Sequence, residues 1–180
     1  MFSAASKDFE TFQVYIITRN HSLIHLTFRL DRHEKALSRL EENSREFRID
    51  PGEKDLVITG QIEEYLDGRR QRFTISTGTF FLDQGTAFQK KVWNLINAIP
   101  YGQTRTYGEL ALQLGSRGYG RAVGRACNAN PLALIIPCHR VVSCKGTGGF
   151  AGGNNVKQQL LEMEKNRSAN KKRADQPKPK

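Results

Sequence analysis

Short apolar runs alternate with turn-forming residues over the first 80 positions of the chain. The alternation predicts two strands of a β-hairpin at 12–18 and 23–30, helices at 31–43 and 55–66, and a return strand at 72–76. In the second helix Leu56, Ile62 and Tyr65 are available to pack inward. This first part is therefore predicted to be a mixed α/β block, and it contains no motif that we can assign to chemistry.

Helical spacing dominates after residue 85. A helix is expected from Thr86 to Ile99, because its apolar residues form one broad face. Thr106 and Glu109 make a capping-box pattern that opens a short helix. A glycine-containing turn follows, and another helix is expected at 120–128. Two short helices joined by such a turn resemble a helix-turn-helix, although many helical hairpins do not bind DNA.

The helix at 120–128 has two distinct faces. The residues that can pack inward are Val123, Ala126 and Cys127. The opposite stripe consists of Arg121, Arg125 and Asn128. Gly120 and Gly124 lie beside this stripe, and each glycine costs a helix roughly 1 kcal/mol relative to alanine. Close approach of either a DNA groove or a neighbouring helix would explain them, and the arginine stripe favours DNA.

An apolar run, Leu132 to Ile136, leads into Pro137, Cys138 and His139. The run predicts a buried strand that delivers Cys138 to the floor of a pocket. A thiol there becomes a nucleophile once it is deprotonated. On an extended chain the next side chain, His139, would point the other way, so direct contact requires a turn, and otherwise a bridging water. The alternative is that Cys138 is simply a small core residue.

A loop with five glycines at 145–153 precedes a predicted helix at 154–165. Glycine loops of this kind often close over a ligand, although a plain surface turn is the alternative. Glu164 falls on the buried stripe of the helix with Val156 and Leu160, and a buried carboxylate needs a partner. A histidine in the Cys138 pocket would supply one. Thiol, histidine and carboxylate form a nucleophile, base and orienter, which peptidases also use.

The chain has 180 residues and a net charge of +10, and its charges are unevenly distributed. Residues 1–80 carry a net charge of −1, whereas residues 110–161 hold six Lys or Arg and no acid. This acid-free stretch fits a polyanion footprint, and Arg140 is counted with Arg117, Arg121 and Arg125 as accessible charge. The alternative is a charge-poor core segment. The basic tail, 167–180, is predicted to be disordered, with Lys171–Arg173 either a nuclear address or a solvated charge run.

Three cysteines without Cys-x-x-Cys spacing argue against a disulfide framework and against a cysteine zinc site. They indicate a reducing intracellular location, which is the cytoplasm in a prokaryote and the nucleus in a eukaryote. His21, His25 and His33 are expected to be exposed or at the hairpin edge. The chain shows neither an apolar run of about 18 residues nor a signal-peptide pattern, so no membrane partner is expected.

Several motifs together resemble one protein family. Ile-Pro-Cys-His-Arg-Val at 136–141 is similar to the active-site motif of the O6-alkylguanine-DNA alkyltransferases. The likeness continues through 107–111, 121–124, Asn130-Pro131, 149–153 and 157–164, in the same order and at near-matching spacing. It covers about residues 88–164, and the first 80 residues match only loosely. Several motifs in one register are far more specific than any one alone.

The resemblance implies an α+β fold. Residues 1–80 would form a ribonuclease-H-like α/β scaffold, and residues 81–166 a mostly helical, winged-helix-like domain that contains the helix-turn-helix. It implies a single-turnover methyltransferase that acts in DNA repair. The expected partner is double-stranded DNA containing O6-alkylguanine, bound by a monomer, with cooperative binding and action on O4-alkylthymine left open. We expect no cofactor, and no convincing zinc ligand set is present.

The resemblance also implies residue roles. Cys138 would accept the alkyl group, Glu164 would hold His139, and His139 would take the thiol proton through a water, while Asn130 organises the loop. In the substrate site Tyr107 would donate to N3 of guanine, the carbonyls of Cys138 and Val141 would read the exocyclic amine, and the backbone N–H of Ala151, beside Gly152, would bind O6. Arg121 would fill the gap left by a flipped base. The other expected DNA-binding residues are Gly124, Arg125, Asn128, Thr106 and Gly108.

Two departures from the family pattern concern the glycine loop. Phe150 stands where a tyrosine is usual, and the loop looks one residue short, which puts the range of accepted alkyl groups in doubt. Two other functions remain to be separated by experiment. One is a damage-binding module in which Cys138 is structural, and the other is a thiol hydrolase.

Overall fold

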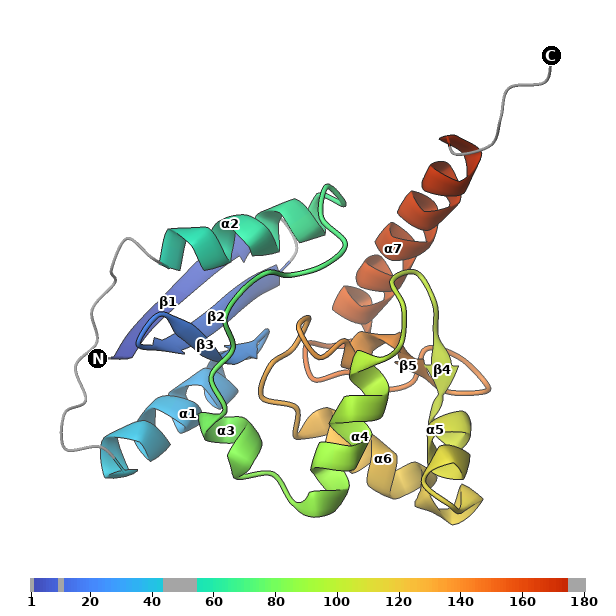
Figure 1. The fold of residues 1–180 in the computed structure, drawn as a ribbon, viewed down its shortest axis with the longest axis horizontal. Helices are drawn as coiled ribbons and strands as arrows, with labels where there is room; N and C mark the ends of the chain where they lie inside the picture. Colours follow the sequence, from blue (N-terminus) through green and yellow to red (C-terminus); the bar gives the residue numbers. More distant parts are fainter. Residues whose placement is uncertain (1, 10–11, 44–54, 175–180) are drawn as a thin grey trace.

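The structure, a computed structural model, describes residues 2–9, 12–43 and 55–174. It begins with a three-stranded antiparallel sheet in the order β1-β2-β3, formed by β1 (Phe2–Phe9), β2 (Phe12–Arg19) and β3 (Ser22–Thr27) (Figure 1). The predicted hairpin is confirmed, and its turn uses Asn20 and His21 at positive φ. The first strand was not predicted, because its sequence, FSAASKDF, is largely small and polar.

Helices cover both faces of this sheet, α1 (Leu30–Asn43) on one and α2 (Asp55–Leu66) on the other (Figure 1). Successive residues of a strand point to opposite faces. Accordingly, Ile16 packs in the cluster that contains Ile62 of α2, whereas Ile17 packs in the cluster with Leu40 of α1. The expectation that Leu56 packs inward was wrong, because it is 70% exposed on the outer side of α2.

The segment after α2 is not the predicted strand at 72–76. It runs beside β3 and shares only isolated hydrogen bonds with it, from Leu23 N to Ser76 O at 2.8 Å and from Gly78 N to Leu23 O at 2.9 Å. A short helix, α3 (Phe80–Asp83), follows within the connection.

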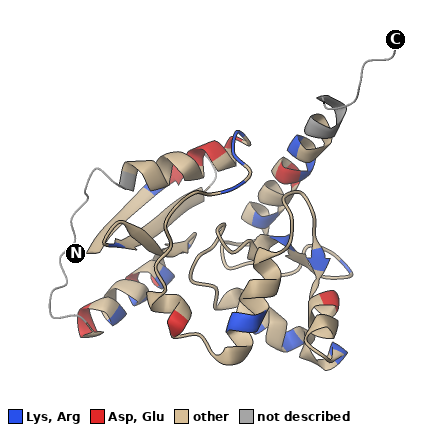
Figure 2. Ribbon diagram, viewed as in Figure 1, with Lys and Arg blue, Asp and Glu red and all other residues tan. Residues whose placement is uncertain are grey.

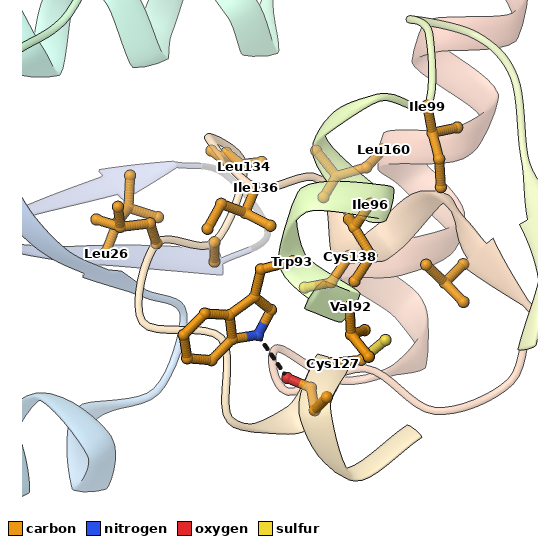
Figure 3. Packing of buried hydrophobic residues seen from close by; sticks show 14 of the residues in the cluster. Leu26, Val92, Trp93, Ile96, Ile99, Cys127, Leu134, Ile136, Cys138 and Leu160 are labelled. Carbon is orange, nitrogen blue, oxygen red and sulfur yellow. Dashed lines mark hydrogen bonds between the residues drawn. The ribbon is translucent and has the colours of Figure 1, made fainter. Parts of the chain in front are cut away.

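The helices predicted after residue 85 are confirmed as α4 (Ala87–Asn97), α5 (Tyr107–Gln113) and α6 (Gly120–Asn128). Thr86 and Thr106 each close a capping box that fixes the start of a helix. A 3-10 turn, η1 (Arg117–Tyr119), joins α5 to α6. The indole N–H of Trp93 donates to the carbonyl of Ala126 at 2.9 Å and ties α4 to α6 (Figure 3). Two short strands, β4 (Arg105–Thr106) and β5 (Val141–Val142), pair in parallel.

Residues 132–136 are buried as expected, but they are not a strand. They form turns, with Leu134 at a φ of 69°, and only Leu132 makes an isolated bridge, to Leu26. Leu26 N donates to Pro131 O at 2.8 Å, and Ala133 N donates to Leu26 O at 3.0 Å. Leu26, Leu134, Ile136 and Trp93 belong to one hydrophobic cluster, so the N-terminal sheet and the later helices share a core (Figure 3).

The last helix, α7 (Asn154–Ala174), continues nine residues past the predicted end, and the expected disorder from residue 167 was wrong up to Ala174. The sequence there has no glycine or proline to stop a helix. Contacts also hold it, because Arg167 donates to Asp67 O at 2.8 Å and Ser168 lies against Gly102. The side chains of Lys171–Arg173 and residues 175–180 lie outside the described part. Within residues 2–9, 12–43 and 55–174, no helix has both the length and the apolar character needed to cross a bilayer.

Candidate active site

Cys138 opens a single 3-10 turn, η2 (Cys138–Arg140), that directly follows the buried turns. It is 5% exposed and lies at the edge of a cavity of about 1210 Å³. One wall of the cavity is α6 and another is the glycine loop. The lining residues are Tyr107, Arg117, Gly118, Gly120, Arg121, Gly124, Arg125, Cys127, Asn128, Cys138, Gly149, Phe150 and Ala151. The thiol thus lies between the arginine-bearing helix α6 and the glycine loop.

Asn130 holds the turn around the thiol. Its amide Nδ2 donates to the carbonyl of Ile136 at 2.7 Å and to Sγ of Cys138 at 3.2 Å, and its Oδ1 accepts from Leu132 N at 3.0 Å. Burial raises the pKa of the Cys138 thiol, and the Asn130 hydrogen bond and the Lys157 charge offset only part of this effect. Cys138 therefore rests as a thiol and needs a base before it can react.

His139 and Glu164 form the predicted pair, and both are fully buried. The ring Nε2 of His139 lies 2.7 Å from Oε1 of Glu164. Burial lowers the pKa of His139 more than the carboxylate raises it, so the ring is neutral. A neutral ring bound to a carboxylate through Nε2 carries its proton there. The other nitrogen, Nδ1, is then a free base, and it is buried with no hydrogen-bond partner among the described residues.

The carboxylate of Glu164 has more partners than expected. Arg140 donates to it through Nε and Nη2 at 3.0–3.1 Å, and the backbone N–H of Gly102 donates at 2.8 Å. The hydroxyl of Tyr65 donates to Oε1 as well. Burial alone would raise the pKa of Glu164, but hydrogen bonds from His139 and Arg140, together with the charge of Arg140, lower it to about 2. Burial raises the pKa of Tyr65 well above its ordinary value, so it stays a donor.

Arg140 is therefore not part of a DNA-facing surface, and counting it as accessible charge was wrong. It is 7% exposed, pairs with Glu164 and donates to the carbonyl of Ile99 at 2.7 Å. A buried arginine with a complete set of acceptors is tolerated because its charge is paired. The partners Tyr65 and Arg140 could not be found from spacing, since Tyr65 lies 99 positions from Glu164.

Lys157 joins the glycine loop to the active turn. Its buried Nζ donates to the carbonyls of Val141 at 2.5 Å and Gly149 at 3.1 Å, and it lies 5.7 Å from the centre of the Tyr107 ring. The hydroxyl of Tyr107 donates to Gly149 O at 3.1 Å. Burial raises the pKa of Tyr107 to about 12, so it is a hydrogen-bond donor over the whole physiological range.

Aromatic rings support the loop from the N-terminal sheet. The Phe150 ring centre lies 6.3 Å from that of His139 and 5.6 Å from that of Phe28. Phe28 is itself 5.3 Å from Phe12. A Cβ atom on Gly152 would come within 2.8 Å of Phe28, so only glycine fits this contact. Phe28 is a site-supporting residue that no local motif could indicate.

The predicted substrate and DNA residues divide into two groups. Tyr107, Ala151, Arg121, Gly124, Arg125 and Asn128 all line the cavity with Cys138. Val141, Gly152, Thr106 and Gly108 are not among the described residues that line it, and Thr106 caps α5. Arg32, which the sequence did not single out, donates to the side chain of Asn128 at 2.8 Å and to its backbone carbonyl.

Two predicted surface histidines are in fact buried. His25 and His33 are 7% and 8% exposed, with ring centres 6.4 Å apart, whereas His21 is exposed in the turn. Their positions follow from the strand and helix faces that meet between β3 and α1. Over the described ranges, no three His, Cys, Asp or Glu side chains are grouped to hold a metal ion.

Comparison with known proteins finds one consistent set of relatives. A family model described as "6-O-methylguanine DNA methyltransferase, DNA binding domain" matches residues 87–166. A methylated-DNA–protein-cysteine methyltransferase of Methanosarcina acetivorans is 46% identical over 105 residues, which are 58% of this chain and 65% of that protein. One of Mycobacterium tuberculosis is 43% identical over 120 residues, 66% of this chain and 70% of that protein.

Solved structures agree over nearly the whole chain. The crystal structure of M. tuberculosis O6-methylguanine methyltransferase is similar with a TM-score of 0.76 and 34% identity, covering 93% of this chain and 94% of that one. A crystal structure of the M. tuberculosis protein in complex with DNA gives a TM-score of 0.71 and 35% identity, covering 92% and 93%. The likeness therefore includes the N-terminal sheet, where sequence motifs were not informative.

Proposed function

The chain belongs to the methylated-DNA–protein-cysteine methyltransferase family, and from this premise we propose that it repairs DNA by moving an alkyl group from O6 of guanine to Cys138. The observation that carries the proposal is the geometry around the thiol. Cys138 lies in a cavity walled by Arg121 and Arg125, and behind it a neutral His139 is tied by Nε2 to a carboxylate. This arrangement supplies a nucleophile, a base and a surface for a polyanion in one place.

The first step is removal of the thiol proton. The thiol has a raised pKa, and Nδ1 of His139 is unprotonated and has no partner in the part of the chain that the structure describes. A water between Sγ and Nδ1 would pass the proton to the ring. Glu164 would stabilise the resulting imidazolium, because its low pKa keeps it charged. Asn130, which donates to Sγ, would stabilise the thiolate.

The second step is displacement at the alkyl carbon. The thiolate attacks in line, a bond forms between sulfur and carbon, and the carbon–O6 bond breaks with its electron pair left on the guanine. The hydroxyl of Tyr107 would donate to N3 of the departing base, with Ala151 N–H directed at O6. The product is a thioether, which has no ready hydrolysis route. The protein would therefore react once per molecule.

The target base must leave the helix stack to reach the cavity. Arg121 is exposed at the start of α6 and lines the cavity mouth, where it can fill the space that the base leaves. Gly124, Arg125 and Asn128 would contact the DNA along the same helix, with Thr106 and Gly108 at the start of α5. The proposed division of labour assigns residues 81–166, with a winged-helix-like arrangement, to DNA and chemistry. Residues 1–80, with a ribonuclease-H-like arrangement, would be the supporting part of a monomer.

Intact-protein mass spectrometry tests the proposal. The protein is mixed with a duplex that carries one O6-methylguanine, alongside the variants Cys138→Ser and Cys144→Ser. Cys144 is a free, exposed cysteine and controls for nonspecific alkylation. We expect a gain of one methyl group, saturating at one per protein, in the wild type and in Cys144→Ser only. Binding of the lesion without mass gain would indicate a damage-binding module, and repeated turnover on amide substrates would indicate a hydrolase.

A second test addresses base flipping. Arg121→Ala should slow reaction with duplex DNA much more than reaction with the free alkylguanine base, because only the duplex requires a base to be extruded. Equal losses on both substrates would contradict this role for Arg121.

A further inference from the structure

A second cleft lies between α1 and the C-terminal end of α6, and Asn130, which donates to Sγ of Cys138, lines it from the side of the active turn. Its volume is about 500 Å³. One wall is the face of α1 that carries Arg32, Lys35 and Arg39, and Asp31 is the only acidic residue among the described residues that line it. Spacing of three and four residues places these three cations on one side of the helix.

Among the residues that the structure describes, few acidic groups compensate the positive charge of this face. The carboxylate of Asp31 is bound by Arg29, at 2.6 and 2.7 Å, so these two charges cancel. Arg39 donates to the neutral amide of Gln84, and Arg32 donates to Asn128. Hydrogen bonds to neutral groups orient a guanidinium but leave its charge free to attract an anion.

The cleft adjoins the cavity at Cys138 at the end of α6. Asn128 lines both cavities. The C-terminal end of a helix carries partial negative charge, which would repel a phosphate. Arg32 donates to the backbone carbonyl of Asn128 at this end of α6 and so places positive charge there. Figure 2 shows basic residues on both α1 and α6.

The spacing along α1 suits a nucleic-acid backbone. Arg32 and Arg39 lie seven positions apart, which is about 10 Å along the helix axis, with Lys35 between them. Phosphates of one DNA strand follow one another at about 3.4 Å of helix axis, so the face spans about three base pairs. The floor of the cleft does not add charge, because burial lowers the pKa of His25 to about 3 and keeps it neutral. Lys35 and Arg39 are exposed and Arg32 is half-buried, so a duplex can reach the positive charge of this face.

We propose that Arg32, Lys35 and Arg39 bind the phosphates of about three base pairs of DNA beyond the C-terminal end of α6. The N-terminal part of the chain would then be a direct part of the DNA interface. This inference rests on the proposed function in that the partner is the same DNA. The inference goes beyond the proposed function because it predicts that α1 contributes to the affinity for DNA. This helix lies outside the residues matched by the family model.

The test compares two double variants that remove the same amount of charge. Lys35→Gln/Arg39→Gln removes two cations of α1. The control, Lys7→Gln/Arg69→Gln, removes two exposed cations that pair with Glu63 and Asp67 on the α2 side of the sheet. Both variants have a net charge two lower than the +10 of the wild type. A difference between them therefore reports position and not total charge.

The readout is fluorescence anisotropy with an unmodified 24-base-pair duplex at several salt concentrations. Each phosphate contact contributes about 0.9 to the slope of log K against log salt. We expect the slope to fall by about 1.8 in the α1 variant and to remain near the wild-type value in the control. Equal slopes in all three proteins would overturn the proposal. So would unchanged slopes together with binding of a mononucleotide in the cleft, which would indicate a small-anion site.

Unmodified DNA keeps this test separate from the proposed reaction. If the wild type gains no methyl group in the mass experiment, the proposed function fails. The comparison of slopes still decides whether α1 contacts the DNA.

Discussion

Replacing Glu164 with glutamine would remove the charge at the centre of the buried network while keeping the shape of the side chain. The pKa of Glu164 is lowered from 4.5 to about 2. A pKa difference of one corresponds to about 1.4 kcal/mol, so the carboxylate stabilises the folded state by about 3 kcal/mol at pH 7. The same magnitude is typical for breaking a buried ion pair, and here Arg140 would be left without its counter-charge.

The pH dependence gives this prediction a second, independent part. Because the folded pKa is depressed, the stabilisation is fully present above the unfolded value of about 4.5 and is lost as the pH falls towards about 2. Between pH 7 and pH 3.5 the wild type should lose about 1.4 kcal/mol of this contribution. The glutamine of Glu164→Gln cannot titrate, so the difference in the free energy of unfolding between the two proteins should narrow by that amount.

The assay is thermal and urea unfolding of both proteins at the two pH values. At pH 7 we expect Glu164→Gln to unfold about 6–12 °C below the wild type. Glu162→Gln is the matched control, since Glu162 is exposed on the same helix and accepts a hydrogen bond from Gln158. The reasoning is refuted if both variants unfold at the same temperature, or if the difference for Glu164→Gln does not shrink at pH 3.5.

Three further predictions concern the thiol and the loop. Asn130→Ala should raise the pKa of Cys138, because Sγ loses its hydrogen bond, and alkylation by iodoacetamide should require a higher pH. Lys157→Met should also raise that pKa, since the nearby charge is lost, and should slow methyl transfer at pH 7 by about tenfold, a barrier change of about 1.4 kcal/mol. Phe28→Ala should loosen the loop at Phe150, and a looser loop should admit a larger alkyl group. The rate of transfer from O6-benzylguanine should therefore rise relative to the rate from O6-methylguanine.

Each of these predictions has a control within the chain. Asn94→Ala and Lys91→Met change exposed residues of α4 and should leave the reactivity of the thiol unchanged. Phe9→Ala removes a ring that packs on Phe12, whereas Phe28 packs directly on Phe150 of the loop. A thiol that titrates identically in Asn130→Ala and wild type would contradict the first prediction. If Lys91→Met slowed methyl transfer as much as Lys157→Met, the second prediction would be contradicted. If Phe9→Ala changed the preference for O6-benzylguanine as much as Phe28→Ala, the third would be contradicted.

The sequence predicted the helices well because their signals are local. The capping box of Thr106 and Glu109 and the apolar stripe of α6 each lie within a few residues. The same local view failed at Leu132–Ile136, since an apolar run indicates burial but not whether the backbone is extended or turned. The sequence pattern also missed β1, because its polar residues pair through backbone hydrogen bonds, which the side-chain pattern does not indicate.

The centre of the site could be predicted, but not its surroundings. Cys138, His139 and Glu164 stood out from their motif and from helical spacing. Tyr65 and Phe28 come from the N-terminal part of the chain and reach the site only through the tertiary fold. Arg140 was predicted to be accessible because arginines are rarely buried without a partner. It is buried because it pairs with the buried carboxylate of Glu164.

The network at Glu164 sets how the site can fluctuate. One carboxylate binds Tyr65 from α2, Gly102 after α4, and both His139 and Arg140 of the active turn. A local opening that frees the ring of His139 must break contacts from all of these segments together, and its free energy approaches that of global unfolding. The amide of Arg140 should then exchange its hydrogen only when the whole protein unfolds. Enzymes that release product need a site that opens repeatedly. A protein that reacts once does not release product, so a rigid site does not limit its activity.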